Sequence, residues 1–121
     1  MPILVSIVED YAPVRKIMAE RIGQAPGMKL VGTYPDAESA LEDLPRHPAD
    51  VVLMDINLPG LCGIECVRRL KPQLPATQFV MMTVYMDADR IFKALAAGAT
   101  GYLLKRSSHT ELLQAIREVA A

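Results

Sequence analysis

Several short apolar segments of this chain end at side chains that can handle phosphate or a metal ion. These side chains are three acids, a hydroxyl and an amine: Glu9, Asp10, Asp55, Thr83 and Lys105. Carboxylates bind Mg²⁺ through oxygen, and an ammonium or a hydroxyl suits the oxygens of a phosphoryl group. A carboxylate such as Asp55 can also act as a nucleophile towards phosphorus. If these side chains lie together, the chemistry that they support best is phosphoryl transfer.

The elements that must position these residues are the strands of a parallel sheet. Strand signals alternate with helix signals five times along the 121 residues, which predicts an α/β fold of the (βα)5 type. The expected strands cover residues 3–8, 30–34, 50–55, 77–83 and 101–104. Because ligands in open α/β sheets bind beyond the carboxyl ends of the strands, we expect the polar side chains to share one edge.

Helices are predicted in the gaps between these strands and after the last one. Residues 13–23 carry apolar side chains at helical spacing. Asp36 and Asp87 can cap the helices that follow them, and Ser108 to Glu111 have the spacing of a capping box. Right-handed crossovers would place the helices on both faces of the sheet.

The composition is typical of one domain without a membrane segment. An apolar content of 51% argues against disorder, and a net charge of −1 does not favour a nucleic-acid-binding surface. No apolar stretch approaches the roughly 20 residues needed to span a bilayer. We therefore expect a single cytoplasmic domain over residues 1–121. Cys62 and Cys66 are expected to be reduced, partly buried thiols in a helix.

Each candidate residue also has a structural explanation when it is taken alone. Asp55 could be a turn or cap residue, and the acids at 9–10 could serve a helix N-terminus. Thr83 could simply end a strand, and Lys105 could be a solvated surface charge. The functional interpretation therefore depends on the occurrence of all these residues at the ends of four predicted strands.

Taken together, these motifs resemble the receiver domain of bacterial response regulators. The resemblance spans essentially the whole chain and is carried by Glu9, Asp10, Asp55, the segment Asn57-Leu58-Pro59-Gly60, Thr83, Tyr102 and Lys105. The segments 82–85 and 98–105 are most similar to the NarL/LuxR subfamily. The resemblance implies a flavodoxin-like fold with a five-stranded parallel sheet in the order 2-1-3-4-5 and helices on both faces.

The resemblance also implies a chemical role for each position. Asp55 would accept a phosphoryl group from a sensor histidine kinase. Asp10 and Asp55 would ligate Mg²⁺ directly, together with the backbone carbonyl of Asn57. Glu9 would act on the metal mainly through water, and Lys105 would hold a phosphoryl oxygen.

A switch between two states follows from the same resemblance. Thr83 would swing towards the phosphoryl group and Tyr102 would change rotamer with it, which would reshape the face of the fourth helix, fifth strand and fifth helix. Without the resemblance, Tyr102 would be an ordinary half-buried strand aromatic. The domain would catalyse only its own phosphorylation and dephosphorylation.

The implied partners lie outside the chain itself. Members of the subfamily usually carry a C-terminal helix-turn-helix, so a transcriptional effector and any DNA contact would lie beyond these residues. A homodimer is expected, through the first and fifth helices or through the face of the fourth helix. No membrane contact is expected.

Two positions depart from the common receiver pattern. Val84 follows Thr83 where many receivers carry a smaller residue, which predicts slower phosphorylation by small donors or slower self-hydrolysis. Arg106 follows Lys105 where many receivers carry a proline, often cis. Because a cis bond before any other residue is costly, we expect a trans bond or local strain there. NarL-type receivers often lack this proline too.

Three other classes of protein share some of these features. A haloacid-dehalogenase-like phosphohydrolase also uses an aspartyl nucleophile with Mg²⁺, but its nucleophile follows the first strand and has a second Asp two residues on. Here Asp55 follows the third predicted strand, and Asn57 is two residues on. A phosphate-independent interaction module would not need the charged residues at the strand ends. A flavin-binding flavodoxin shares the fold, but the acidic loop 9–13 lacks phosphate-cradling Gly, Ser or Thr.

Overall fold

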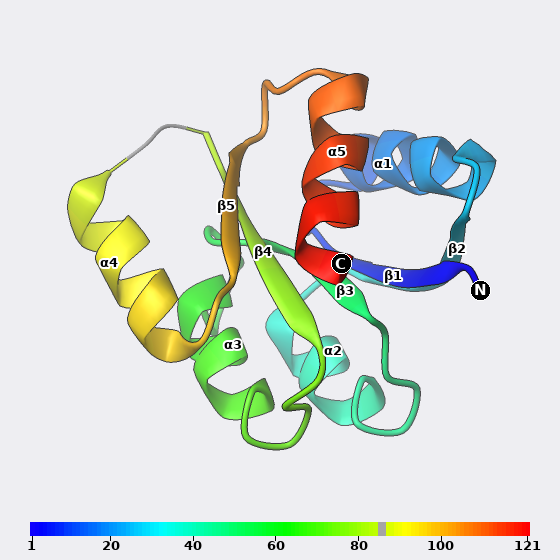
Figure 1. Cartoon of the computed structure of the whole chain (residues 1–121). Coiled ribbons are helices and arrows are strands. Elements are labelled where there is room, and N and C mark those ends of the chain that lie inside the picture. Colours follow the sequence, from blue (N-terminus) through cyan, green and yellow to red (C-terminus); the bar gives the residue numbers. More distant parts are fainter. Residues whose placement is uncertain (85–86) are drawn as a thin grey trace.

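The computed structural model describes residues 1–84 and 87–121, in which strands and helices alternate (Figure 1). The strands are β1 (Ile3–Val8), β2 (Met28–Tyr34), β3 (Val51–Asp55), β4 (Gln78–Thr83) and β5 (Gly101–Leu104). The helices are α1 (Ala12–Gln24), α2 (Ala37–Asp43), α3 (Gly63–Leu70), α4 (Ala88–Ala97) and α5 (His109–Ala120). Tyr85, part of a segment similar to NarL/LuxR receivers, lies outside the described residues. None of the described helices has the length and apolar character needed to cross a membrane.

The described strands form one parallel sheet with the order β2-β1-β3-β4-β5, which confirms the implied topology. The central strand β3 is buried along its whole length, as its unbroken apolar run predicts. Since β1 and β3 pair directly, Glu9 and Asp55 emerge from neighbouring strands. This is also where the strand order reverses, the usual place for a ligand site in such sheets.

Helices cover both faces of the sheet, and each face has its own apolar core. Figure 1 shows α1 and α5 on one face and α2, α3 and α4 on the other. The first core includes Ile22 of α1 and Ile116 of α5, and the second includes Val67 of α3 and Ala94 of α4. Alternate residues of β3 point into the two cores, which is why residues 51–54 are all apolar.

The predicted helix caps are confirmed. Asp36 and Asp87 cap α2 and α4 through their carboxylates, and Ser108 and Glu111 form a reciprocal capping box at α5. Gly98 ends α4 with a φ of 116°, a conformation that residues with a side chain rarely adopt. These short-range signals set where each helix begins and therefore how the loops leave the strand ends.

The structure differs from the predicted boundaries at the second strand and at the first cysteine. β2 begins at Met28 and not at residue 30, because Met28 pairs with Ile3 of β1 and pairing is not visible in local propensity. Cys62 precedes α3 and is exposed, although both cysteines are free, as expected. Cys66 is buried, and burial raises the pKa of its thiol to about 12, which disfavours the reactive thiolate.

Candidate functional site

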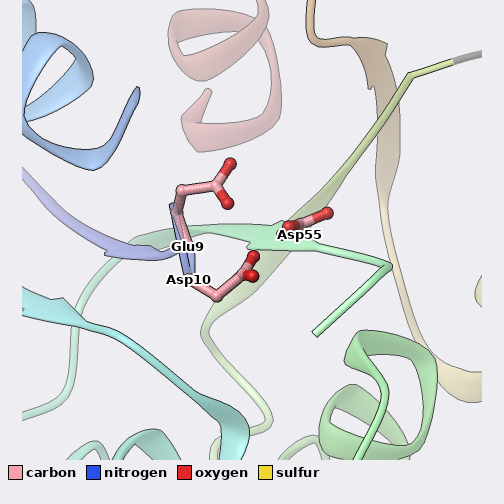
Figure 2. A group of neighbouring side chains, drawn as sticks. All are labelled: Glu9, Asp10 and Asp55. Atoms are coloured by element: carbon pink, nitrogen blue, oxygen red, sulfur yellow. The ribbon is translucent and has the colours of Figure 1, made fainter. Parts of the chain in front are cut away.

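Three carboxylates meet at the C-terminal edge of the sheet. Glu9 and Asp10 follow β1, and Asp55 is the last residue of β3. Figure 2 shows the three side chains gathered at this edge, where one oxygen of each lies within 4.8 Å of the others. Glu9 and Asp55 are only 1% and 2% exposed, whereas Asp10 is exposed to solvent. The acidic cluster expected from the sequence is therefore formed.

The ammonium of Lys105 bridges two of these carboxylates. Its Nζ lies 2.7 Å from Glu9 Oε1 and 3.0 Å from Asp55 Oδ2. The backbone N–H of Lys105 donates to the carbonyl of Thr83 at 2.7 Å and so ties the end of β5 to the end of β4. No described peptide bond is cis, so the bond from Lys105 to Arg106 is trans, as expected. Residues from the ends of β1, β3 and β5 are thus in direct contact.

Backbone packing holds Asp55 in place. The N–H of Asn57 donates to Asp55 Oδ1 at 3.1 Å, which leaves Oδ2 for Lys105. Gly63 opens α3 directly against this segment, and a Cβ at Gly63 would lie 2.0 Å from the Asp55 carbonyl oxygen. Only glycine permits so close an approach. Sequence reasoning does not single out Gly63, although a glycine at the first position of a helix is a signal of close packing.

Arg15 of α1 fixes the segment that carries the other two acids. Its Nη1 donates to the carbonyl of Glu9 at 2.7 Å and to that of Asp10 at 3.4 Å. The N–H of Tyr11 donates to Glu9 Oε2 at 3.2 Å. The sequence gives no sign of this role for Arg15, because an arginine on an amphipathic helix is ordinarily a surface charge.

Burial is the largest single influence on the pKa values of Glu9 and Lys105. Loss of water around Glu9 raises its pKa from 4.5 to about 7, although the hydrogen bond from Lys105 lowers it. Asp55 also contributes to the raised pKa of Glu9, but burial is the larger cause. Burial lowers the pKa of Lys105, yet its hydrogen bonds to Glu9 and Asp55 outweigh burial and leave that pKa raised.

Thr83 and Tyr102 are neighbours on adjacent strands. Thr83 is buried at the end of β4, and Tyr102 is half-buried in β5 against the core under α2, α3 and α4. Burial raises the pKa of the Tyr102 hydroxyl, and the side chain of Thr83 partly offsets this rise. The pair therefore lies on the side of the sheet that α4 covers.

A residue of α4 reaches the loop after β3. Asn57 is exposed, and its Oδ1 accepts a hydrogen bond from Arg90 Nη1 at 2.9 Å. Both residues line an open hollow of about 610 Å³ that also includes Asp10. The two residues are 33 positions apart, so sequence spacing gives no sign of this contact.

The donor set suits a hard divalent cation. The clustered atoms are carboxylate oxygens, which are the ligands that Mg²⁺ prefers, whereas Zn²⁺ sites usually include nitrogen or sulfur. Ligands on opposite sides of Mg²⁺ are about 4 Å apart, given metal–oxygen distances of about 2.0–2.1 Å. The carboxylate oxygens of the cluster lie within 4.8 Å of one another, which is close to this distance between opposite ligands.

Known proteins resemble this chain over nearly its whole length. A family model described as the response regulator receiver domain matches residues 5–117. The chain is 34% identical over 116 residues to the nitrate/nitrite response regulator protein NarP of Escherichia coli (strain K12), across 96% of this chain and 54% of that protein. It is 30% identical over 118 residues to the transcriptional regulatory protein DegU of Brevibacillus brevis, across 98% of this chain and 50% of that protein. The chain thus spans about half the length of these curated relatives.

Solved structures share the same fold. A two-component response regulator of the LuxR family from Aurantimonas sp. SI85-9A1 has a TM-score of 0.93 at 32% identity, over 99% of this chain and 86% of that chain. The response regulator domain of Thermotoga maritima CheB has a TM-score of 0.91 at 29% identity, over 99% of this chain and 97% of that chain. Relatives in sequence and in structure therefore converge on one family.

Proposed function

Since the chain belongs to the family of response regulator receiver domains and is of the NarL/LuxR type, we propose that Asp55 accepts a phosphoryl group from a sensor histidine kinase. The observation that carries this proposal is the contact of Lys105 with Glu9 and Asp55 beside the exposed Asp10. Phosphoryl transfer needs mainly positioning and neutralisation of charge, and these groups supply both.

In the proposed reaction, a carboxylate oxygen of Asp55 forms a bond to phosphorus. The P–N bond to the kinase histidine breaks, and its electron pair goes to the imidazole, whose other ring nitrogen carries the proton. The carboxylate is held at one oxygen by the Asn57 N–H and at the other by Lys105, so the nucleophile has a defined orientation. Attack of water on phosphorus would later release phosphate and restore Asp55.

The residues that would hold Mg²⁺ are Asp10, Asp55 and the backbone carbonyl of Asn57, with Glu9 acting mainly through water. Bound there, Mg²⁺ would neutralise charge on the phosphoryl oxygens. The all-oxygen donor set at the edge of the sheet supports this assignment.

The remaining residues would bind the phosphoryl group and report its presence. Lys105 would hold one phosphoryl oxygen, and Thr83 would move towards another. Tyr102 would change rotamer with Thr83, because the two side chains already interact. The face formed by α4, β5 and α5 would change shape, as a population shift biased by one added dianion.

The output of the switch would lie elsewhere in the protein. A receiver is a signalling domain, and its own phosphorylation and dephosphorylation would be the chemistry that it catalyses. Because the curated relatives are about twice as long as the matched region and include regulators of transcription by name, we propose control of a transcriptional effector that binds DNA outside these residues. We also propose a cytoplasmic location and a homodimer through α1 and α5 or through the face of α4.

Intact mass after incubation with acetyl phosphate and Mg²⁺ tests the proposal. Wild type and the control Asp89→Asn, an exposed acid on α4, are expected to gain one base-labile phosphoryl group, and Asp55→Asn is expected to gain none. Absence of an adduct with steady hydrolysis of the donor would favour a phosphohydrolase. Neither adduct nor hydrolysis, even with candidate kinases, would favour a phosphate-independent module.

A further inference from the structure

The hollow beside the acidic cluster carries two cations that the proposed reaction does not use. It has a volume of about 610 Å³, and its lining includes Asp10 and Asn57 from the site together with Arg90 and Lys93 of α4. A hollow of this size admits a small phosphodonor. The two cations therefore line the same hollow as Asp10, the exposed member of the acidic cluster.

Arg90 is held in place without being neutralised. Its Nη1 donates to Asn57 Oδ1 at 2.9 Å, and this acceptor is an uncharged amide oxygen. Within residues 1–84 and 87–121, no carboxylate lies within 4.0 Å of the Arg90 guanidinium or the Lys93 ammonium. The charge of Arg90 is also felt inside the domain, where it opposes the burial that raises the pKa of Tyr102.

We propose that Arg90, supported by Lys93, is a specificity-determining residue that draws anionic phosphodonors to Asp55 and favours donors of higher negative charge. This inference rests on the proposed function and adds the class of donor that the site selects. The hydrogen bond to Asn57 keeps the Arg90 guanidinium beside the site. A surface arginine without such a bond would instead spend most of its time in bulk water.

The charge balance at the site gives the physical reason. The three carboxylates are balanced by the ammonium of Lys105 and, as proposed, by Mg²⁺, so the cluster itself offers an approaching anion little net attraction. Cations at the mouth of such a site raise the local concentration of the anion and its association rate, and salt weakens this effect. The increase in association rate that Arg90 provides should therefore grow with the negative charge of the donor.

Two small donors differ in charge but give the same product. With the acetyl phosphate dianion, Asp55 forms the bond to phosphorus, the P–O bond to the acetyl group breaks, and acetate leaves with the electron pair. With the phosphoramidate monoanion, whose nitrogen is already protonated, the P–N bond breaks and neutral ammonia leaves. Both reactions balance without another reactant, so their rates can be compared on one protein.

The test compares second-order rate constants of adduct formation, measured by intact mass with Mg²⁺, for both donors. Arg90→Gln is expected to lower the acetyl phosphate constant about 3- to 10-fold at low ionic strength. The phosphoramidate constant should fall less, and both effects should shrink at about 0.5 M salt. Arg90→Lys should keep about half or more of the wild-type constant because it keeps the charge.

A matched control removes the same charge elsewhere. Arg117 is exposed on α5, which covers the opposite face of the sheet from α4 (Figure 1), and Arg117→Gln is expected to leave both rate constants unchanged. The midpoint of urea unfolding, measured alongside, is expected to be the same for Arg90→Gln and wild type, since the Arg90 guanidinium donates to the side chain of the exposed Asn57.

The outcomes separate this inference from the proposed function. If Arg90→Gln forms the Asp55 adduct at the wild-type rate, the inference is wrong and the proposed function stands. An equal loss with both donors that salt does not reduce would also overturn it, because that pattern indicates a structural role. If wild type forms no adduct on Asp55, the proposed function fails and the inference fails with it.

Discussion

Glu9 is a buried carboxylate whose contact with Lys105 does not offset the loss of water around it. Its pKa is raised by burial from 4.5 to about 7. A group with a raised pKa binds its proton more tightly in the folded state. Its contribution to stability is therefore fully present below about pH 4.5 and is lost as the pH rises through about 7.

The raised pKa of Glu9 makes the stability of the domain depend on pH. In Mg²⁺-free buffer, the free energy of unfolding of wild type relative to Glu9→Gln should fall by on the order of 2 kcal/mol between pH 5 and pH 8. Glutamine is neutral throughout, so it provides the reference. Urea titrations at the two pH values check this, with Glu20→Gln, an exposed acid on α1, as the control. A difference that does not change with pH would contradict the prediction.

Val84 is a second residue with a measurable consequence. It directly follows Thr83 and is 60% exposed, so its β-branched side chain stands in solvent beside the end of β4. We expect Val84→Ala to speed phosphorylation by small donors or self-hydrolysis, because a smaller residue widens access to Asp55. Time courses of adduct formation and decay measure both rates, and no change in either rate would show that Val84 does not limit access.

The packing of α3 against the end of β3 positions Asp55. The helix can approach the Asp55 backbone only because its first residue is Gly63, where a Cβ would meet the Asp55 carbonyl oxygen at 2.0 Å. A backbone oxygen cannot rotate aside as a flexible side chain can. Any larger residue must therefore displace the helix or the strand end that carries Asp55.

The prediction for this packing is a large effect from one methyl group. Gly63→Ala should lower the free energy of unfolding by about 2–4 kcal/mol and slow phosphorylation of Asp55. A Cβ at Gly23 of α1 would meet no atom within 4 Å outside its own stretch of helix backbone, so Gly23→Ala should instead raise stability by about 0.5–1 kcal/mol. Urea unfolding of both variants checks this contrast, and similar effects at the two glycines would refute it.

The sheet connects the acidic cluster to the surface formed by α4 and β5. Thr83 ends β4, and Tyr102 lies in β5 and packs against the core that includes Ala94 of α4. Figure 1 shows β4 and β5 side by side. A change at the Thr83 side chain can therefore reach the α4 and β5 surface without a change in the buried strand β3. This arrangement supports a switch in which the core stays fixed and one face moves.

A substitution at Thr83 should separate phosphorylation of Asp55 from the response of α4 and β5. In wild type, phosphorylation should change amide hydrogen exchange in α4 and β5. Thr83→Ala should still form some adduct but lose at least about half of that exchange change, because the link to Tyr102 is removed. Thr33→Ala, an exposed threonine on the far edge strand β2, is the control. An unchanged exchange response in Thr83→Ala would exclude this route.

Local signals in the sequence predict most of the elements because those signals act over a few residues. The boundaries of β1 and β5 agree with the apolar runs, and the caps at Asp36, Asp87 and Ser108 begin their helices where expected. The order of the strands comes from the family resemblance and not from periodicity, and the start of β2 is missed because it depends on pairing with β1. Glu9, Asp10, Asp55, Thr83 and Lys105 can be proposed as site residues because each lies at or just after the end of a strand.

The contacts that give these residues their properties arise from packing between distant parts of the chain. Lys105 meets Asp55 across 50 positions, and Arg90 meets Asn57 across 33. The raised pKa of Glu9 comes mainly from its burial, which no local pattern encodes. Residue types and their places on strands can thus be inferred from short-range signals. Burial, ion pairing and close backbone approach appear only once the folded chain brings remote segments together, because they depend on what surrounds each atom in three dimensions.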